Sequence, residues 1–212
     1  MDFLPKAIAK YSEDHTTQDV DLLHQITRET HLEVLKPRML SGHLQGRVLS
    51  MISHMISPKN ILEIGTYTGY SALCLAEGLS DQGELVTIER NEELEHKILN
   101  YFKNSPYREK LHLKIGDARK IIPQLENTWD LIFIDADKES YQTYFDLTID
   151  QVRTGGFILI DNVLWSGKVA DDDKNDKATQ SIRAFNQRMH ADPRVENVLL
   201  PIRDGIMILR KL

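Results

Sequence analysis

The feature that most restricts the fold is an alternation of short apolar runs with segments of helical periodicity, which begins at residue 60. The first run opens the segment NILEIGTYTGYS, and the next four are GELVTIE, LHLKIGD, WDLIFIDA and GGFILIDN. Strands that alternate with helices form a mostly parallel sheet covered on both faces. Two further runs flank Asp204 and Gly205, a pair typical of hairpin turns. We therefore predict an α/β, Rossmann-like fold with a mostly parallel seven-stranded sheet and an antiparallel C-terminal hairpin strand.

The first 57 residues follow a different pattern, because they carry helical periodicity without apolar strands between. A length of 212 residues fits one domain. We predict a single domain over residues 1–212, in which 1–57 form an N-terminal helical cap and 58–212 form the α/β core. The segments expected to be helical include residues 19–35, 44–56, 91–103, 139–152 and 177–190.

The composition is that of a soluble globular protein, with 41% hydrophobic and 27% charged residues. No apolar run approaches the roughly 20 residues that a membrane-spanning helix needs. The amino-terminal stretch carries charges and Pro5 where a signal peptide would have an unbroken apolar region. We therefore expect a cytoplasmic protein with no membrane partner. The net charge of -6 makes a nucleic-acid partner unfavourable.

Cysteine and histidine usage argues against disulfide and zinc chemistry. The single cysteine, Cys74, has no partner for an internal disulfide and lies among apolar residues, so we expect it to be buried filler. The eight histidines are scattered, without an H-E-x-x-H motif or a paired spacing.

The segment NILEIGTYTGYS, residues 60–71, predicts a strand, a tight turn and the start of a helix. Gly65 and Gly69 allow a sharp turn and a close approach of a ligand to the backbone, and Ser71 opens the helix. Glu63 lies within the buried strand, where a carboxylate requires a structural or functional reason. These residues indicate a nucleotide-type site.

The spacing of the glycines restricts which nucleotide could bind. A dinucleotide site has the pattern G-x-G-x-x-G, whereas this turn has two glycines four positions apart. Glu89 ends the second strand, where Rossmann-like folds place a carboxylate on ribose hydroxyls. A ligand with a ribose but no pyrophosphate fits both observations, and S-adenosylmethionine is the common one. The alternative is an ordinary strand-to-helix turn without a ligand.

Polar residues end the other strands at the same edge of the sheet. Asp117 follows the third strand, and with Ala118 it is expected near an adenine ring. Asp135, Asp161 and Asn162 follow the next two strands and offer only oxygen atoms, which suits Mg²⁺, Mn²⁺ or Ca²⁺. We predict magnesium. The alternative for each residue is a helix cap or a closed turn.

Lys138 lies three residues after Asp135 in the segment IDADKESY. Close to a divalent cation, its pKa could be lowered, which would make it a base for a substrate hydroxyl. The alternative is a solvated lysine at a helix start, where the helix dipole disfavours a cation.

Several segments resemble the cation-dependent O-methyltransferases of the caffeoyl-CoA and catechol type, including small bacterial members. They are LEIGTYTGYSALCLA, TIER, IGDA, FIDADKESY, LIDNVLWSGKV and DPR with LLPIRDGI, and the resemblance extends over residues 36–211. It implies the S-adenosylmethionine-dependent methyltransferase fold, and methylation of one hydroxyl of a catechol-like or vicinal-diol phenolic small molecule bound to the metal. It also implies a homodimer.

The resemblance assigns roles to individual positions. Asp135, Asp161 and Asn162 correspond to metal ligands, with Asp135 and Lys138 catalytic and Lys138, Asn162 and Trp165 next to the substrate. Trp129 is expected in the core instead. The positions corresponding to cofactor contacts are Met39, Ser41, Glu63, Gly65, Thr66, Tyr67, Ser71, Glu89, Arg90, Asp117, Ala118, Asp135 and Asp137.

The acceptor is less defined than the cofactor. The acidic run KVADDDKNDK, residues 168–177, is expected to be a solvated loop near the site and argues against a polyanionic acceptor such as a CoA thioester. Some bacterial relatives methylate hydroxylated uridine in transfer RNA, which is the alternative enzymatic function. A non-catalytic nucleotide-binding protein is a further alternative, and an NAD-linked oxidoreductase is disfavoured by the missing third glycine.

Overall fold

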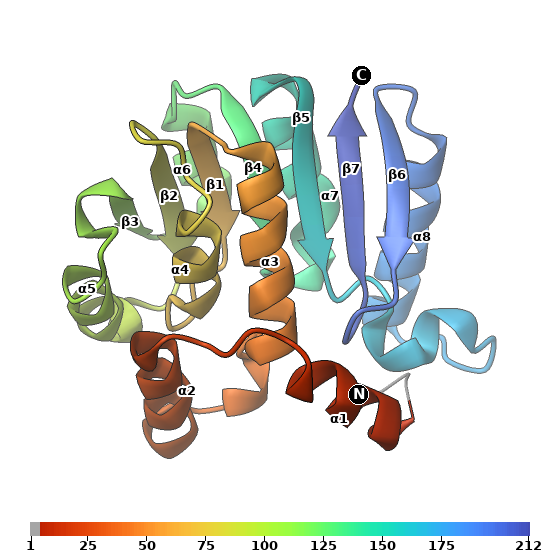
Figure 1. The fold of residues 1–212 in the computed structure, drawn as a ribbon. Helices are drawn as coiled ribbons and strands as arrows, with labels where there is room; N and C mark the ends of the chain where they lie inside the picture. Colours follow the sequence, from red (N-terminus) through yellow and green to blue (C-terminus); the bar gives the residue numbers. More distant parts are fainter. Residues whose placement is uncertain (1–4) are drawn as a thin grey trace.

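The computed structural model describes residues 5–212 as a seven-stranded sheet between two layers of helices (Figure 1). The strands lie in the order β3-β2-β1-β4-β5-β7-β6. Their bounds are β1 (Asn60–Ile64), β2 (Glu84–Glu89), β3 (Leu111–Ile115), β4 (Trp129–Ile134), β5 (Val152–Asp161), β6 (Val195–Leu200) and β7 (Ile206–Lys211).

Strand β7 runs in the direction opposite to that of the other six strands of the sheet. It pairs antiparallel with β5 on one side and with β6 on the other, while β1 to β5 pair in parallel. The predicted hairpin therefore forms, with Arg203 (φ 48°) and Gly205 (φ 89°) in its connection. The expected α/β fold, mostly parallel with an antiparallel C-terminal strand, is confirmed.

The helices cover both faces of the sheet. The α-helices are α1 (Lys6–Asp14), α2 (Asp21–Glu33), α3 (His43–Ile56), α4 (Tyr70–Ala76), α5 (Glu95–Lys103), α6 (Ala118–Ile121), α7 (Tyr141–Thr148) and α8 (Lys177–Ala191). The 3-10 turns are η1 (Pro37–Met39), η2 (Glu92–Leu94), η3 (Arg108–Lys110), η4 (Ile122–Gln124), η5 (Lys138–Ser140), η6 (Ile149–Gln151) and η7 (Trp165–Ala170).

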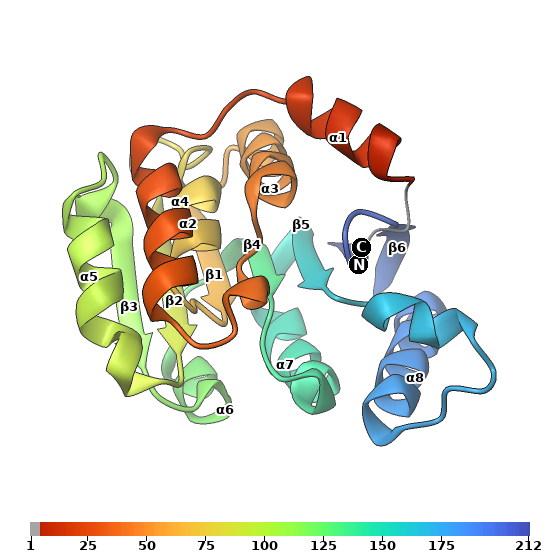
Figure 2. The same ribbon diagram turned by 90° about the horizontal axis from the view of Figure 1, so that it is seen from below.

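Alternate residues of the central strands serve two separate apolar cores. Ile61 of β1 joins a core formed with α2, α3, α4 and α5, whereas Leu62 joins a core formed with α6, α7 and α8. Figure 2, which looks from below, shows these two helical layers on either side of the sheet. Cys74 and Trp129 are fully buried, as expected.

Two expected boundaries are wrong. The helix expected over residues 139–152 is divided into η5, α7 and η6, and β5 begins at Val152 rather than at the glycines that follow. Val152 pairs with Trp129 at the start of β4, and the register then shifts before Leu131 pairs with Phe157. Strand pairing thus extends β5 toward its amino end.

The first part of the chain forms three helices, in agreement with the helical character expected for 1–57, although residues 1–4 of that segment lie outside the described part. Helix α3 packs on α4 and reaches the sheet, and α1 contacts α3. The division into a cap and a core remains a prediction. Among residues 5–212, every helix is too short or too polar to cross a bilayer.

Candidate active site

The glycine turn, residues 65–69, connects β1 to α4 at the carboxyl edge of the sheet. Gly65 has φ 102° and Gly69 has φ 84°, values that favour glycine. A Cβ atom on Gly65 would lie 2.0 Å from the backbone oxygen of Asp135. The turn therefore packs directly against the end of β4, and a side chain at residue 65 would force the two strand ends apart.

Glu63 lies beneath this turn and is fully buried. Its two oxygens accept hydrogen bonds from Ser71 Oγ at 2.6 Å and Thr87 Oγ1 at 2.5 Å. Burial raises the pKa of Glu63 to about 8, although these two hydrogen bonds oppose the shift. Its expected contact with the cofactor stays a prediction, since its observed partners are the hydroxyls that support the turn.

Glu89, at the end of β2, holds the glycine turn from the other side. Oε2 of Glu89 accepts from the backbone N–H of Tyr67 at 2.7 Å, and Oε1 accepts from the N–H of Asn91 at 2.8 Å. Tyr67 has φ 52°, a costly conformation for an aromatic residue that this hydrogen bond helps to maintain. The carboxylate is therefore fixed in place at the position where a ribose is expected.

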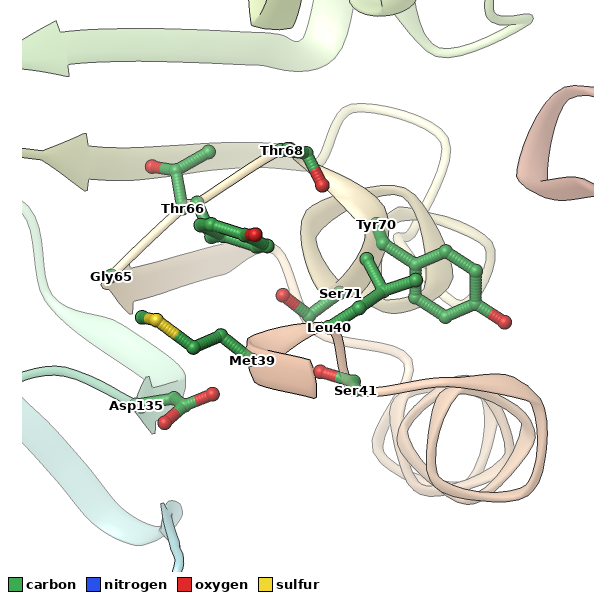
Figure 3. Close-up of a pocket in the computed structure, with 10 residues that line it drawn as sticks. Met39, Leu40, Ser41, Gly65, Thr66, Thr68, Tyr70, Ser71 and Asp135 are labelled. Carbon is green, nitrogen blue, oxygen red and sulfur yellow. The ribbon is translucent and has the colours of Figure 1, made fainter. Parts of the chain in front are cut away.

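A pocket opens between the glycine turn and the segment that precedes α3 (Figure 3). Met39 extends toward the space between Gly65 and Asp135. The structure brings together predicted cofactor residues from three parts of the chain. Those that line the pocket are Met39, Ser41, Gly65, Thr66, Tyr67, Ser71 and Asp135.

Three further lining residues were absent from the sequence-based set, namely Leu40, Thr68 and Tyr70. Each is adjacent in sequence to a predicted residue, so the motif identified the segment but not every member. Buried Thr68 Oγ1 accepts a hydrogen bond from Thr30 Oγ1 at 3.1 Å, which connects the glycine turn to α2. That contact joins residues 38 positions apart, so no local sequence pattern predicts it.

The other predicted cofactor residues lie outside the lining. Arg90 is exposed, and Ala118 is buried at the start of α6. Asp117 caps α6 by accepting from the backbone N–H of Arg119 at 3.0 Å. The Arg119 side chain also binds this carboxylate, which lowers the pKa of Asp117 to about 2. Asp117 therefore acts as a helix cap, a role that was not predicted for it, and its expected place near the adenine ring stays a prediction.

Asp137 is held away from the pocket lining by α7. It accepts a hydrogen bond from Tyr144 Oη at 2.6 Å. Burial alone would raise the pKa of Asp137, but the hydrogen bonds from Ser140 and Tyr144 lower it. The carboxylate is therefore ionised at neutral pH beside the site.

The predicted metal ligands meet around the Lys138 ammonium. Lys138 Nζ lies 3.1 Å from Asp135 Oδ1 and 2.5 Å from Asn162 Oδ1. Buried Asp161 accepts from the backbone N–H of Asn162 at 2.7 Å and from Gln45 Nε2 at 2.7 Å. The ends of β4 and β5 thus bring all three predicted ligands and the predicted base into one group.

The electrostatics of this group suit a cation. Burial raises the pKa of Asp161 to about 7, and repulsion by the nearby Asp135 carboxylate contributes to this shift. An ammonium already lies between Asp135 and Asn162, where a metal ion could replace it. The described residues contain no cluster of three or more His, Cys, Asp or Glu arranged for a metal. The predicted metal ligands are not such a cluster, because only Asp135 and Asp161 are acids and the third ligand oxygen comes from the amide of Asn162.

In this structure the pKa of Lys138 is raised, and the lowering expected beside a divalent cation stays a prediction. Burial disfavours its charged form, but the nearby Tyr141, Asp135 and Asp161 outweigh burial and raise the pKa. The expectation assumed a divalent cation as neighbour, whereas here the neighbours are anionic or polar. The alternative of a solvated lysine is wrong, since the side chain is only 15% exposed.

The backbone after the metal residues is conformationally strained. Asn162, Trp165 and Ser166 have φ values of 59°, 47° and 58°, which are costly outside glycine and are found most often at functional sites. Trp165 Nε1 is buried without a hydrogen-bond partner. Trp165 thus lies next to the metal residues, and its contact with the acceptor stays a prediction.

The segment after Trp165 is more ordered than a solvated loop over 168–177 would be. Turn η7 continues to Ala170, and Arg183 of α8 donates to the carbonyls of Lys168 and Val169 at 2.9 Å each. The charged loop therefore occupies only residues 171–176, before α8 begins at Lys177.

The chain matches the family described as O-methyltransferase over residues 13–212. It is 35% identical over 212 residues to a probable caffeoyl-CoA O-methyltransferase 2 from Dictyostelium discoideum, with 97% of this chain and 92% of that protein covered. It is 36% identical over 180 residues to caffeoyl-CoA O-methyltransferase 5 from Nicotiana tabacum, which covers 79% and 75%.

Solved structures are similar over the same extent. An SAH-bound methyltransferase from Podospora anserina has a TM-score of 0.91 at 30% identity, with 100% of this chain and 99% of that chain covered. An O-methyltransferase from Bacillus cereus in complex with SAH has a TM-score of 0.88 at 30% identity, with 97% of both chains covered.

Proposed function

This chain belongs to the O-methyltransferase family and is S-adenosylmethionine-dependent, and we propose that it methylates one hydroxyl of a catechol-like or vicinal-diol phenolic small molecule with the help of Mg²⁺. One observation carries this proposal. Asp135 lines the pocket beneath the glycine turn and also contacts Lys138 in the group of predicted metal ligands. Cofactor and acceptor would therefore meet at Asp135.

The cofactor would lie in the pocket between the glycine turn and residues 39–41. S-adenosylmethionine supplies the methyl group when bound. Glu89 would accept from the ribose hydroxyls, since its carboxylate is held at the end of β2 by two backbone N–H groups. Ser71 and Glu63 would keep the turn in its conformation through their 2.6 Å hydrogen bond.

Asp135, Asp161 and Asn162 would hold the metal ion, because a set of carboxylate and amide oxygens suits Mg²⁺, and Mn²⁺ or Ca²⁺ as substitutes. The ion would supply positive charge to two neighbouring acceptor oxygens, which aligns them and favours loss of a proton. Three protein ligands leave space for both oxygens of a diol. An acceptor that places two neighbouring oxygens on the metal ion must be a diol, which favours a catechol-like molecule.

Lys138 would receive the acceptor proton at Nζ. In this structure Nζ binds Asp135 and Asn162, and the nearby charges raise the pKa of Lys138. Lys138 would lose both contacts when those oxygens bind a cation, and repulsion by that cation would lower its pKa. The residue then remains beside the acceptor as a base of suitable strength.

Transfer of a radiolabelled methyl group to a panel of catechols tests this function. We expect turnover that is lost with EDTA and restored by Mg²⁺, and that requires two adjacent hydroxyls. Turnover that persists in EDTA would contradict the role of the metal. Labelled transfer RNA, with binding that weakens steeply as salt is added, would instead support the alternative acceptor.

We also propose a homodimer. Helices α1 and α3 contact each other (Figure 2), and both carry apolar side chains that are exposed to solvent. Tyr11 of α1 is 64% exposed and Met55 of α3 is 76% exposed, and exposed apolar surface favours association. Light scattering should give twice the 24.4 kDa chain mass. Charged replacements at Tyr11 and Met55 together should give the monomer mass.

A further inference from the structure

Gln45 is the one described side chain outside the predicted set that donates to a side-chain oxygen of a predicted metal ligand. It lies on α3, is 1% exposed, and donates from Nε2 to Asp161 Oδ2 at 2.7 Å. The other oxygen of Asp161 accepts from the backbone N–H of Asn162. Each carboxylate oxygen therefore has one fixed donor and retains a lone pair for a cation.

Arg203 determines the orientation of the Gln45 carboxamide. Arg203 Nη1 lies 3.4 Å from Gln45 Oε1, so the oxygen of the amide faces a cation while the nitrogen faces Asp161. The two contacts agree on one orientation, because the reverse would place the NH₂ group against the guanidinium. Arg203 has φ 48°, which a hairpin connection would ordinarily assign to glycine or asparagine.

The same nitrogen of Arg203 connects this pair to the cofactor pocket. It donates to the backbone oxygen of Leu40 at 2.9 Å. Leu40 belongs to the strap, defined here as residues 37–42, and three strap residues line the pocket. Contacts thus run without interruption from the strap through Arg203 and Gln45 to Asp161.

We propose that Gln45 is a positioning residue for Asp161 and that Arg203 couples its orientation to the strap over the cofactor. The proposal rests on the proposed function, since it requires Asp161 to bind the metal ion. Gln45 holds the carboxylate in the rotamer that faces Asp135 and Asn162. A bound cofactor fixes the strap, which keeps Arg203 and Gln45 in place, so cofactor and metal should each bind more tightly in the presence of the other.

Binding of Mn²⁺, measured by electron paramagnetic resonance of the free ion, tests the role of Gln45 without using activity. The variant Gln45→Met keeps the length of the side chain and removes the donor. We expect its Mn²⁺ affinity to fall roughly 10–100-fold, as is usual when the partner of a metal ligand is removed. At saturating Mg²⁺ its kcat should return to the value of the unmodified protein, while the Mg²⁺ concentration required rises.

Ser53→Ala is the matched control on the same helix. Ser53 is fully buried and loses one hydrogen bond, from Oγ to the Leu75 carbonyl at 2.6 Å, away from the site. This variant should lose thermal stability without losing Mn²⁺ affinity. Unchanged Mn²⁺ affinity in Gln45→Met would overturn the positioning role, and equal losses of affinity in both variants would reduce it to a general effect of folding.

Arg203→Met tests the coupling between cofactor binding and metal binding. Because Arg203 is exposed, we expect this variant to fold. In the unmodified protein, saturating S-adenosylhomocysteine should tighten Mn²⁺ binding by roughly 5-fold or more, and in Arg203→Met this factor should approach one. Arg210→Met, which removes an exposed guanidinium paired with Glu196, should retain the full factor. Full coupling in Arg203→Met would overturn the connection through the strap.

Asp161→Ala separates failure of this inference from failure of the proposed function. Loss of Mn²⁺ binding in Asp161→Ala, together with unchanged binding in Gln45→Met, would refute only the positioning role. Unchanged Mn²⁺ binding in Asp161→Ala would show that the metal ion binds elsewhere, which refutes the metal assignment and the positioning role with it.

Discussion

The acidic residues in the two halves of the sheet's carboxyl edge have different electrostatic surroundings. Beneath the glycine turn, Glu63 and Glu89 each receive two hydrogen bonds from neutral hydroxyl or backbone donors. At the ends of β4 and β5, Asp135 and Asp161 repel each other, and the Lys138 ammonium lies against Asp135. The protein's own neutral donors balance Glu63 and Glu89, whereas the repulsion between Asp135 and Asp161 is offset only by a positive charge.

This difference indicates that Glu63 and Glu89 support the structure of the glycine turn, whereas Asp135 and Asp161 form a site for a cation. Neutral donors fix a carboxylate in position, and Asp161 has two of them as well, from Gln45 and the backbone of Asn162. What distinguishes Asp161 is the charge of Asp135 beside it, which neutral donors do not offset. Two carboxylates that face each other across a buried space are unfavourable unless a cation balances them. We therefore expect substitutions in the cofactor half to affect cofactor affinity and folding, and substitutions in the metal half to affect methyl transfer.

The largest expected effect is that of Asp161→Ala. Loss of one of two carboxylates should weaken the metal site enough to lower kcat/KM by about 10³-fold, equivalent to about 4 kcal/mol of transition-state stabilisation. Methyl transfer at fixed Mg²⁺ measures it. Asp192→Ala is the control, because Asp192 is a half-buried acid bound by Arg194 at the end of α8. Comparable losses in the two variants would contradict a specific role for Asp161.

Lys138→Met should have the next largest effect. Removal of the base should lower kcat by roughly 100-fold, at the lower end for general-base catalysis because the metal shares in activating the acceptor. Affinity for S-adenosylhomocysteine, measured by calorimetry, should not change. Lys177→Met, which breaks an exposed ion pair with Glu139, should retain full activity. An unchanged kcat in Lys138→Met would assign the proton to another group.

Glu89→Gln should produce a smaller effect on the opposite half. The amide can no longer accept from both Tyr67 and Asn91, and the ribose loses a charged acceptor, so cofactor affinity should fall by roughly 10-fold. Calorimetric titration with S-adenosylhomocysteine measures this loss, while Mn²⁺ affinity without cofactor should stay constant. Glu84→Gln, at the other end of β2, provides the control. A selective loss of Mn²⁺ affinity would reverse the assignment of the two halves.

Glu63→Gln should have the smallest effect on catalysis and a clear effect on pH dependence. The pKa of Glu63 is about 8 in the folded protein against an ordinary 4.5, so its contribution to stability is complete below pH 4.5 and is lost as the pH rises through 8. Between pH 6 and 8, the protein should lose about 2 kcal/mol, or about 5 °C in Tm, relative to Glu63→Gln. Parallel Tm curves for the two proteins would contradict a buried neutral Glu63.

The sequence predicts the sheet well because its strands are buried on both faces and read as continuous apolar runs. It also places Asp135, Asp161 and Asn162 together, since parallel strands bring their ends to one edge. The contacts of Gln45 and Arg203 could not be predicted, because they connect residues 116 and 158 positions apart without a local pattern. The capping role of Asp117 was likewise not predicted, because helix caps and ligand contacts use the same residue type.

Anomalous diffraction from a crystal grown with Mn²⁺ and S-adenosylhomocysteine tests the central claim most directly. We expect one strong peak within ligand distance of Asp135, Asp161 and Asn162, with Lys138 Nζ displaced from the two oxygens that it contacts in this structure. A site without a peak, or a peak at other residues while Lys138 keeps its contacts, would contradict the claim that this edge of the sheet is built for a cation.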